Sequence, residues 1–419
     1  MNDEIITGLD IGAHSIHIAV GKPMPIEDGE REQIHIIGAI EVPAEGINRG
    51  TITNMDEAVS SVSRALDLAE RITGVPVSSA WVAIAGPNIH SQDSRGVVGV
   101  SRGDGEIKDE DVERVIEAAK TVATPSNYEI LHVIPRAFTV DGQRGVKDPI
   151  GMSGVRLEVD ATIVQALGSQ MNNLTKCVYR TGLDIDDLVY APLATSESVI
   201  TPRQKELGVA VVNIGASTTS IILFEEGDMV FTSVLPIGSG HITNDIAIGL
   251  RTSIEIAEHV KLKAGSADSS EIQKKDEIDL ADFGAPESEF VSRKYIAQII
   301  EARVEEIMAK IDDEFKKAQR SGMLPAGVVF TGAGSKLAGI VDVAKKELRL
   351  PASIGTPIGV TTVIDQANDP AFSTAIGLVL WGQKIHGTQP ARFMDVFSKI
   401  KSIDAARDSL KKWFKSMLP

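Results

Sequence analysis

The chain has 419 residues, of which 43% are hydrophobic, and a formal net charge of −16. A chain of this length can bury more than one core, so we expect two to four domains or subdomains. The negative charge disfavours a nucleic-acid backbone as the main partner, because neutralising phosphates needs a concentrated excess of Lys and Arg.

The single cysteine, Cys177, excludes an intrachain disulfide. One cysteine fits a reducing compartment, and we expect it in the core rather than as a nucleophile. The first residues lack a basic segment leading into an apolar one, and no uninterrupted apolar run reaches about 18 residues. The sequence therefore predicts a protein that is neither exported nor membrane-spanning.

The first predicted element, ITGLDIGAHSIHIAVG at residues 6–21, recurs as GVAVVNIGASTTSIIL at residues 208–223. Placing Asn213 on Asp10 also places Gly215 on Gly12. Each copy is a β-branched run, a Gly-containing turn and a second β-branched run, which predicts a β-hairpin whose strands are buried on both faces. Where the first copy carries a carboxylate, the second carries an uncharged amide of the same shape.

Helical patterns separate these hairpins and follow them. The helices expected from apolar spacing and end signals cover residues 55–73 with Asn54 as cap, 108–122, 169–182, and 292–322 with Gly322 as stop. Residues 326–348 predict a strand, a Gly-rich turn and a helix with Lys345 and Lys346 near its end. A mixed α/β fold follows.

Two stretches depart from this pattern. Residues 81–165 contain several strand-like runs around one helix and predict a small α/β insertion. Residues 264–292 are polar, acidic and turn-rich, which is typical of an exposed hairpin region or a partly ordered excursion. Residues 386–404 lose strand character and predict a linker.

Glycine turns at hairpin tips suit phosphate binding, since they present backbone N–H groups with little steric cover. Two facing tips would hold one polyphosphate. Ser15, Ser217, Thr218 and Thr219 would add hydroxyl donors, and Asp10 could order water around Mg²⁺. A single glycine turn is more often structural, so the duplication carries the inference. His14 and His17 lie on the first hairpin without the further ligands that a zinc site needs.

Two such hairpins with a third Gly-rich turn resemble the actin, hexokinase and DnaK-chaperone superfamily. Long stretches resemble one family within it, the bacterial cell-division protein FtsA. They are ILHVIPRAFTVDGQRGVKDPIGMSGVRLEV (130–159), KCVYRTGLDIDDLVYAPLATSESVITPRQKELGVAVVNIG (176–215), LPIGSGHITNDIAIGLRTSIEIAEHVKLKAG (235–265) and VSRKYIAQIIEARVEEIM (291–308). The resemblance covers nearly the whole chain.

The resemblance implies an α/β, actin-like two-domain fold with ribonuclease H-like halves, an inserted FtsA-type subdomain and a C-terminal amphipathic helix. The implied domains are residues 1–80 with 166–204 (subdomain 1A), 81–165 (1C, a polymer interface), 205–236 with 302–385 (2A), 237–301 (2B), the linker 386–404 and the helix 405–419.

The resemblance also implies a site for ATP and Mg²⁺. Its residues would be Asp10, Gly12, Ala13, His14 and Ser15 (phosphate 1), Asn213, Gly215, Ala216, Ser217, Thr218 and Thr219 (phosphate 2), Gly238, the ribose- and adenine-side pair Glu258 and Lys261, and the adenosine turn Gly332, Ala333, Gly334 and Lys336. Glu258 and Lys261 are three apart on one helical face, so an exposed ion pair is the alternative interpretation.

The same resemblance implies slow hydrolysis. Active members of the superfamily usually carry acids where this chain has Asn213 and, just before Pro192, Ala191. Without them, the roughly 10²- to 10⁴-fold contribution of a general base is missing. Glu197 is the one candidate substitute acid, and an Asn213 that only bonds its own turn is the alternative reading. We expect at most a weak ATPase.

The C-terminal segment AARDSLKKWFKSMLP carries an apolar stripe beside basic residues, against the charge of the whole chain. This pattern predicts a membrane-surface helix rather than a helix docked on its own domain. The predicted membrane residues are Leu410, Lys411, Lys412, Trp413, Phe414, Lys415, Met417 and Leu418. The sequence leaves open whether residues 393–403 join this helix.

The resemblance implies a polymerising scaffold that anchors FtsZ to the inner face of the cell membrane at the division septum and meets later divisome proteins. The FtsZ C-terminal peptide would meet the cations Arg293, Lys294 and Arg303, which are otherwise solvated helix charges. Two rival functions stay open: a phosphotransferase such as a sugar or acetate kinase, and an actin-like scaffold of another machine such as pilus assembly.

Overall fold

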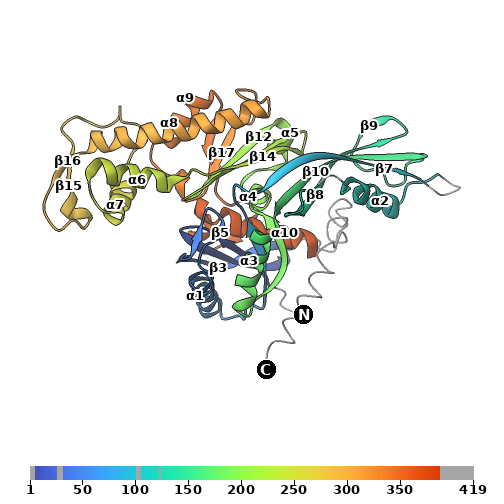
Figure 1. Cartoon of the computed structure of the whole chain (residues 1–419), viewed down its shortest axis with the longest axis horizontal. Coiled ribbons are helices and arrows are strands. Elements are labelled where there is room, and N and C mark those ends of the chain that lie inside the picture. Colours follow the sequence, from blue (N-terminus) through green and yellow to red (C-terminus); the bar gives the residue numbers. More distant parts are fainter. Residues whose placement is uncertain (1–4, 26–31, 101–104, 122–123, 387–419) are drawn as a thin grey trace. The chain divides into compact units, whose positions relative to one another are not determined.

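The computed structural model describes residues 5–25, 32–100, 105–121 and 124–386. The chain forms two compact units. The larger takes in the residues up to 91, residues 127–131 and residues 165–383, and the smaller centres on residues 92–126 and 132–164. Figure 1 follows the chain through both.

The first sheet of the larger unit has six strands in the order β11-β6-β1-β2-β3-β19. Its strands are β1 (Ile6–Ile11), β2 (Ser15–Pro25), β3 (Glu32–Pro43), β6 (Ser79–Ile84), β11 (Asp184–Tyr190) and β19 (Val360–Thr362). The first three are antiparallel neighbours, whereas β6, β11 and β19 run parallel to theirs. β1 and β2 confirm the first predicted hairpin.

The second sheet has five strands in the order β14-β13-β12-β17-β18. Its strands are β12 (Val209–Ile214), β13 (Thr219–Glu225), β14 (Asp228–Leu235), β17 (Val328–Thr331) and β18 (Ala352–Ile354). It repeats the first sheet: three antiparallel strands joined in sequence, with two parallel strands beside the first of them. The sequence repeat therefore reflects a repeated topology.

Helix α1 (Met55–Thr73) covers the first sheet where β2 and β3 run, and its neighbour α3 (Gly168–Arg180) packs on β11 of the same sheet. Asn54 caps α1 by accepting from the backbone N–H groups of Asp56 and Glu57, and Gly74 ends it in the left-handed conformation. Both ends agree with the sequence prediction, because the end signals are local. Cys177 on α3 is buried, as expected.

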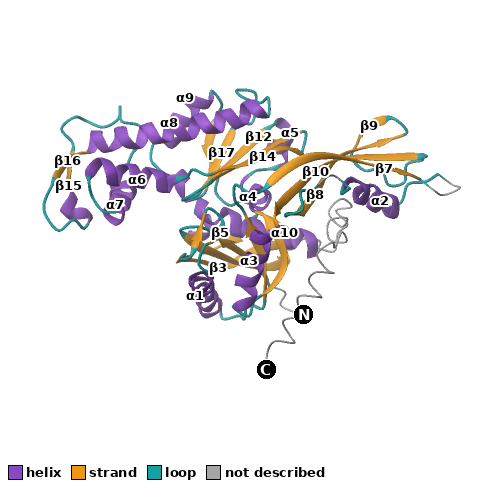
Figure 2. Cartoon of the chain, viewed as in Figure 1, coloured by secondary structure: helices purple, strands orange, loops and turns teal. Residues whose placement is uncertain are grey.

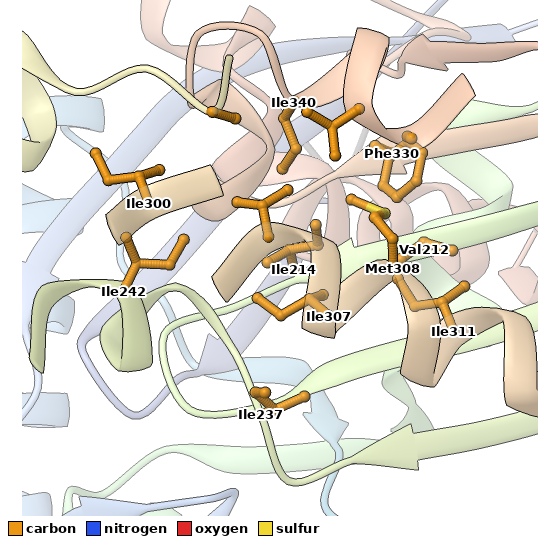
Figure 3. Packing of buried hydrophobic residues seen from close by; sticks show 14 of the residues in the cluster. Val212, Ile214, Ile237, Ile242, Ile300, Ile307, Met308, Ile311, Phe330 and Ile340 are labelled. Carbon is orange, nitrogen blue, oxygen red and sulfur yellow. The ribbon is translucent and has the colours of Figure 1, made fainter. Parts of the chain in front are cut away.

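The second sheet packs on a helical layer that holds one large core (Figure 3). The helices of this half are α5 (Pro202–Leu207), α6 (Ser239–Leu250), α7 (Ile254–Ala264), α8 (Arg293–Lys317) and α9 (Ile340–Leu348). Val212 and Ile214 of β12 meet Ile307 and Met308 of α8 in this core. The apolar strand ends thereby hold the second hairpin rigidly against α6 and α8.

Two further helices, α4 (Ala191–Val199) and α10 (Ser373–His386), cross at close range. A Cβ on Gly377 would lie only 1.9 Å from the carbonyl oxygen of Ala194. The Thr195 and Thr374 hydroxyls are 2.9 Å apart, and Ser198 Oγ donates to the carbonyl of Ser373 at 2.6 Å. Small residues therefore bring Thr374 to a fixed position beside the strand ends.

Short elements complete the larger unit. They are the hairpins β4 (Ile47–Asn48) with β5 (Thr51–Ile52) and β15 (Glu277–Asp279) with β16 (Phe290–Ser292), and the 3-10 turns η1 (Leu280–Phe283), η2 (Ala333–Lys336), η3 (Asp365–Asn368) and η4 (Pro370–Phe372). β15 and β16 confirm the hairpin reading of residues 264–292.

The smaller unit contains most of a four-stranded sheet of order β7-β10-β8-β9, with one helix (Figure 2). Its elements are β7 (His90–Gly99), β8 (Tyr128–Val140), β9 (Gln143–Val146), β10 (Arg156–Leu167) and α2 (Asp109–Ala119). Ser94 Oγ donates to the carbonyl of Ala119, and a Cβ on Gly96 would lie 2.0 Å from the carbonyl oxygen of Val115. β7 and α2 are therefore in direct contact.

Three expectations need correction. The predicted insertion includes residues 81–84, but β6 lies inside the six-stranded sheet. The predicted second half includes residues 302–385, but β19 pairs with β3, and α10 packs on β1, where a Cβ on Gly8 would lie 2.1 Å from the carbonyl oxygen of Ala375. The helix expected to stop at Gly322 ends at Lys317, because Gln319 already turns to a positive φ.

Candidate functional site

The two predicted phosphate turns close in the same way. Gly12 N–H donates to the carbonyl of Ser15 at 3.1 Å, and Gly215 N–H donates to the carbonyl of Thr218 at 2.9 Å. A Cβ on Gly12 would lie 2.6 Å from that Ser15 oxygen, so a larger residue would open the turn. The duplication seen in the sequence is thus a duplication of turn geometry.

Both turn tips line one cavity of about 810 Å³. It receives Ala13 and His14 from the first turn, Ala216 and Ser217 from the second, and Glu258 from α7. The other lining residues, which the sequence did not predict, are Ile47, Asn48, Arg49, Gly240, His241, Thr243, Asn244, Ile254, Glu255, His259 and Leu262. Two facing tips around one cavity are the arrangement expected for a polyphosphate clamp.

The start of α6 supports the second turn from behind. The N–H groups of Ser239 and Gly240 donate to the carbonyls of Gly215 and Ala216, each at 2.8 Å. A Cβ on Gly238 would lie 2.4 Å from the Gly215 oxygen, which explains the glycine at this predicted site position. Thr219 Oγ1 donates to the carbonyl of Ile237 at 2.8 Å and is buried, so this hydroxyl supports the turn instead of facing the cavity.

The two strand-end residues, Asp10 and Asn213, meet the same hydroxyl. Asn213 Nδ2 donates to Thr374 Oγ1 at 3.2 Å, and Thr374 also hydrogen-bonds Asp10. Burial raises the pKa of Asp10, and its interactions with His17 and Thr374 oppose that rise. The Asn213 amide therefore reaches across to α10, contrary to the reading in which it bonds only its own turn.

A half-buried carboxylate such as that of Asp10 fits Mg²⁺, which usually keeps several waters and takes one or two protein carboxylates. Asp10 would hold such waters. Within the described residues, no group of three His, Cys, Asp or Glu side chains is placed to hold a metal. His17 Nε2 instead lies 3.6 Å from Glu41, and its ring meets Phe372 edge-on at 5.0 Å.

The predicted adenosine turn packs directly on the second strand end. Gly332 has φ +81°, and a Cβ there would lie 2.2 Å from Asn213 Oδ1. A Cβ on Gly334 would lie 2.6 Å from Ile214. Lys336 lies two residues after Gly334 and forms an ion pair with Asp369 at 2.6 Å. Both glycines are thus required by contact with β12, and Ala333 lies between them.

Glu258 and Lys261 form an ion pair at 2.7 Å, and Lys261 Nζ also donates to Thr243 Oγ1 at 2.9 Å. Burial pushes the pKa of Glu258 upward, but the hydrogen bonds from Lys261 and Thr243 outweigh it and leave the pKa below its usual value. Only 9% of the Lys261 side chain is exposed. The two residues thus form the ion pair of the alternative interpretation, but this pair is largely buried instead of exposed.

Glu197, the candidate substitute acid, pairs with Lys205 at 2.8 Å. It is not among the described residues that line the cavity. Ala191, at the position where active members of the superfamily usually carry an acid, is the first residue of α4 and is buried. Glu197, the candidate acid from the sequence, is thus held in an ion pair away from the cavity lining.

The predicted partner cations lie at the start and middle of α8. Arg303 donates to both oxygens of Asp245 and also meets Glu306, and Arg293 Nε donates to the carbonyl of Ala264 at 3.1 Å. Lys294 Nζ lies 3.5 Å from the carbonyl of Ile272. Arg303 is therefore already neutralised by two acids.

Three exposed apolar side chains lie on α6, β16 and α8, and the sequence analysis did not identify them as exposed. Ile248 on α6 is 76% exposed, Phe290 on β16 68% and Tyr295 on α8 48%. Their helical or strand spacing alone gave no sign of exposure, because it does not say which face another element covers.

All eight predicted membrane residues of the C-terminal segment lie outside the described residues. Among the described helices, none has both the length and the apolar character to span a bilayer.

Comparison with known proteins identifies the family of the chain. Residues 210–377 match the family model described as "Cell division protein FtsA", and residues 86–165 match the "SHS2 domain inserted in FTSA". Proteins named cell division protein FtsA are similar over most of their length. That of Bacillus subtilis is 38% identical over 380 residues (90% of this chain, 83% of the relative), and that of Pseudomonas aeruginosa 36% over 379 residues (90% and 89%). That of Borreliella burgdorferi is 35% identical over 415 residues, 99% of both chains.

Solved structures show the fold. The "PilM-PilN type IV pilus biogenesis complex" matches with a TM-score of 0.64 at 16% identity, covering 90% of this chain and 98% of the matched one. MreB5 of Spiroplasma citri bound to AMPPNP matches with a TM-score of 0.54 at 12% identity, covering 92% and 98%. The predicted actin-like fold with an FtsA-type insertion is confirmed, and the chain belongs to the FtsA family of bacterial cell-division proteins.

Proposed function

We propose that this protein is an ATP-binding, polymerising scaffold that anchors FtsZ to the cytoplasmic face of the cell membrane at the division septum. The observation that carries the nucleotide part is the single cavity lined by the tips of both duplicated hairpins. Membership of a cell-division family supports the divisional role.

In this proposal the backbone N–H groups around Ala13, His14, Ala216 and Ser217 hold phosphate oxygens, because glycine-closed turns leave such groups open to a ligand. The turn Gly332–Lys336 and the Glu258–Lys261 pair receive the nucleoside. Mg²⁺, held through water by Asp10, would supply charge neutralisation for the phosphates. The buried ion pair keeps Glu258 charged and oriented.

Hydrolysis in this site would be slow. Asn213 is neutral and donates a hydrogen bond where a general base would accept a proton. Ala191 has no side-chain oxygen, and Glu197 is paired with Lys205. Since none of these residues is positioned as a base, bound ATP would be hydrolysed slowly. It would act mainly as a structural ligand and less as a source of free energy.

We propose that residues 237–301 and the start of α8 receive the C-terminal peptide of FtsZ. Arg293 and Lys294 each use a side-chain nitrogen near a carbonyl and keep their charge for an acidic peptide. Exposed Phe290 and Tyr295 would add apolar contact beside them. Because Arg303 is held by Asp245 and Glu306, its contribution would be smaller than that of the other two.

The inserted unit is proposed to contact neighbouring copies and later divisome proteins. It forms a compact unit of its own, and its residues are not among those lining the cavity in the described chain. Replacing residues 92–164 with a short linker is therefore expected to leave nucleotide affinity unchanged and to abolish filaments. Loss of nucleotide binding in a folded variant would make the insertion part of the site.

The experiment that tests the function is capture of purified FtsZ by this protein. Full-length FtsZ should be retained, and FtsZ lacking its C-terminal peptide should not. Arg293→Glu combined with Lys294→Glu should weaken capture, whereas Lys310→Glu, an exposed change farther along α8, should not. Equal capture of both FtsZ forms would contradict the proposed docking, and no capture at all would reopen the other actin-like scaffolds.

A further inference from the structure

The short hairpin β4–β5 brings an arginine to the wall of the cavity. Ile47, Asn48 and Arg49 all line it, together with the tip of the first phosphate turn. Arg49 has φ +48°, in the left-handed region that residues other than glycine seldom adopt. Arg49 and Gly50 are the two turn residues between β4 and β5, and positive φ at both is usual in such a tight hairpin turn.

Arg49 is also the only Lys or Arg among the described residues that line the cavity. The nearby cations of the predicted site are already paired, Lys261 with Glu258 and Lys336 with Asp369. Within the described chain Arg49 forms no ion pair and is exposed. The cavity therefore offers one uncommitted permanent positive charge, on a planar fork that matches phosphate oxygens.

A buried glutamine fixes the turn that carries Arg49. Gln170 Nε2 on α3 donates to the carbonyl of Gly50 at 2.8 Å and to the carbonyl of Ala85 at 2.9 Å. Its side chain is 5% exposed. A Cβ on Gly50 would lie 2.2 Å from the Ala85 oxygen, so the turn fits only with glycine there. The hairpin is thus fastened to the end of β6.

The cavity extends from the two phosphate turns to α7, where Glu258 lines it. Its lining includes both hairpin tips but, among the described residues, none of the adenosine turn Gly332–Lys336. A cation that shares this wall with the tip of the first phosphate turn is suited to a polyphosphate.

We propose that Arg49 binds the terminal phosphate of a nucleoside triphosphate and that Gln170 is the positioning residue that holds its turn. The proposal rests on the nucleotide site argued above and adds a determinant of triphosphate over diphosphate preference. Arg49 supplies that preference because a diphosphate lacks the group that the guanidinium contacts.

The test measures dissociation constants for ATP and ADP, each with Mg²⁺, on the full chain. Arg49→Ala should weaken ATP binding by roughly 10- to 100-fold, the scale of a charge-assisted hydrogen bond, and ADP binding far less. Arg49→Gly should lose ATP affinity equally, although it relieves the left-handed strain. Arg251→Ala is the matched control, since Arg251 has φ +53° and is not among the described residues of the cavity wall.

Gln170→Leu should lower the ATP-to-ADP affinity ratio, and adding it to Arg49→Ala should not lower that ratio further. A merely structural glutamine would weaken both nucleotides alike, which would overturn its positioning role. Equal loss of ATP and ADP affinity in Arg49→Ala, or no loss, would overturn the assignment of Arg49. If the unaltered protein binds neither nucleotide, the proposed function itself fails, which is a different result from an ineffective Arg49 variant.

Discussion

Asn213 Nδ2 donates to Thr374 Oγ1 at 3.2 Å, and the same hydroxyl bonds Asp10 of the other hairpin. The two copies of the repeat thus end on one side chain of α10. The hydroxyl accepts from the Asn213 amide, so an amide at position 213 is complementary to its surroundings. An ionised carboxylate at position 213 has no proton with which to make this donation.

The first prediction concerns the amide that stands in place of a carboxylate at position 213. Asn213→Asp should raise ATP turnover, toward the lower end of the roughly 10²- to 10⁴-fold that a positioned base supplies. Repulsion between the new carboxylate and Asp10 would raise the pKa of one of them, which favours proton uptake. Phosphate release by the purified protein measures it.

Asn213→Ala is the control, since it removes the amide without adding a base. Turnover by the unaltered protein inside the common range of about 1–10³ s⁻¹ would contradict the account of slow hydrolysis. An unchanged rate in Asn213→Asp, with nucleotide affinity intact, would show that position 213 is not where the base is missing.

A second prediction concerns Gly332. Gly332→Ala should weaken nucleotide binding and stability together, because its Cβ would lie 2.2 Å from Asn213 Oδ1. Gly322→Ala is a matched control with φ +67° and open space around the new Cβ. The control should cost only the left-handed backbone, about 1–2 kcal/mol. Thermal unfolding and ATP titration of both variants decide it, and equal effects would remove the contact with Asn213 from the account.

Much of the local structure was predictable because its signals are local. Asn54 and Gly74 fix both ends of α1, and the Gly-containing turns fix both phosphate hairpins. The repeat itself predicted that the two turns would face each other, and both tips line one cavity. In these places a residue's own backbone preference and the tertiary structure agree.

What could not be predicted depends on partners distant in sequence. β19 pairs with β3 across more than three hundred residues, and no short-range pattern marks that pairing. Thr374 reads as one small residue in an apolar helix, yet it receives both strand ends. Arg49 reads as a turn residue, and only its place on the cavity wall gives it significance.

A third prediction concerns pH and the inserted unit. Burial lowers the pKa of His132 from 6.5 to about 4. Between these values the unfolded chain binds a proton that the folded protein does not, so stability falls as pH falls through that window. The full effect is on the order of 3 kcal/mol. His132→Phe should flatten the pH dependence of denaturant unfolding between pH 4 and 6.5. An unchanged slope would show that His132 does not control it.

A fourth prediction concerns the C-terminal segment, which is read from the sequence. Burying a large apolar side chain contributes roughly 1.5–3 kcal/mol, and each basic residue near an anionic surface about 1 kcal/mol. Trp413→Glu should therefore release the protein from anionic vesicles without changing ATP affinity. Ser416→Glu is a control for the added charge alone. Co-sedimentation of Trp413→Glu with vesicles would contradict the membrane helix.

The measurement that tests the central proposal most directly is recruitment of FtsZ filaments to vesicles of phosphatidylglycerol and phosphatidylethanolamine. With this protein and Mg-ATP present, FtsZ should sediment with the vesicles. With the Trp413→Glu variant, or with FtsZ lacking its C-terminal peptide, it should stay in solution. If FtsZ stays in solution with the unaltered protein, or sediments equally with the Trp413→Glu variant, this protein is not the tether between FtsZ and the membrane.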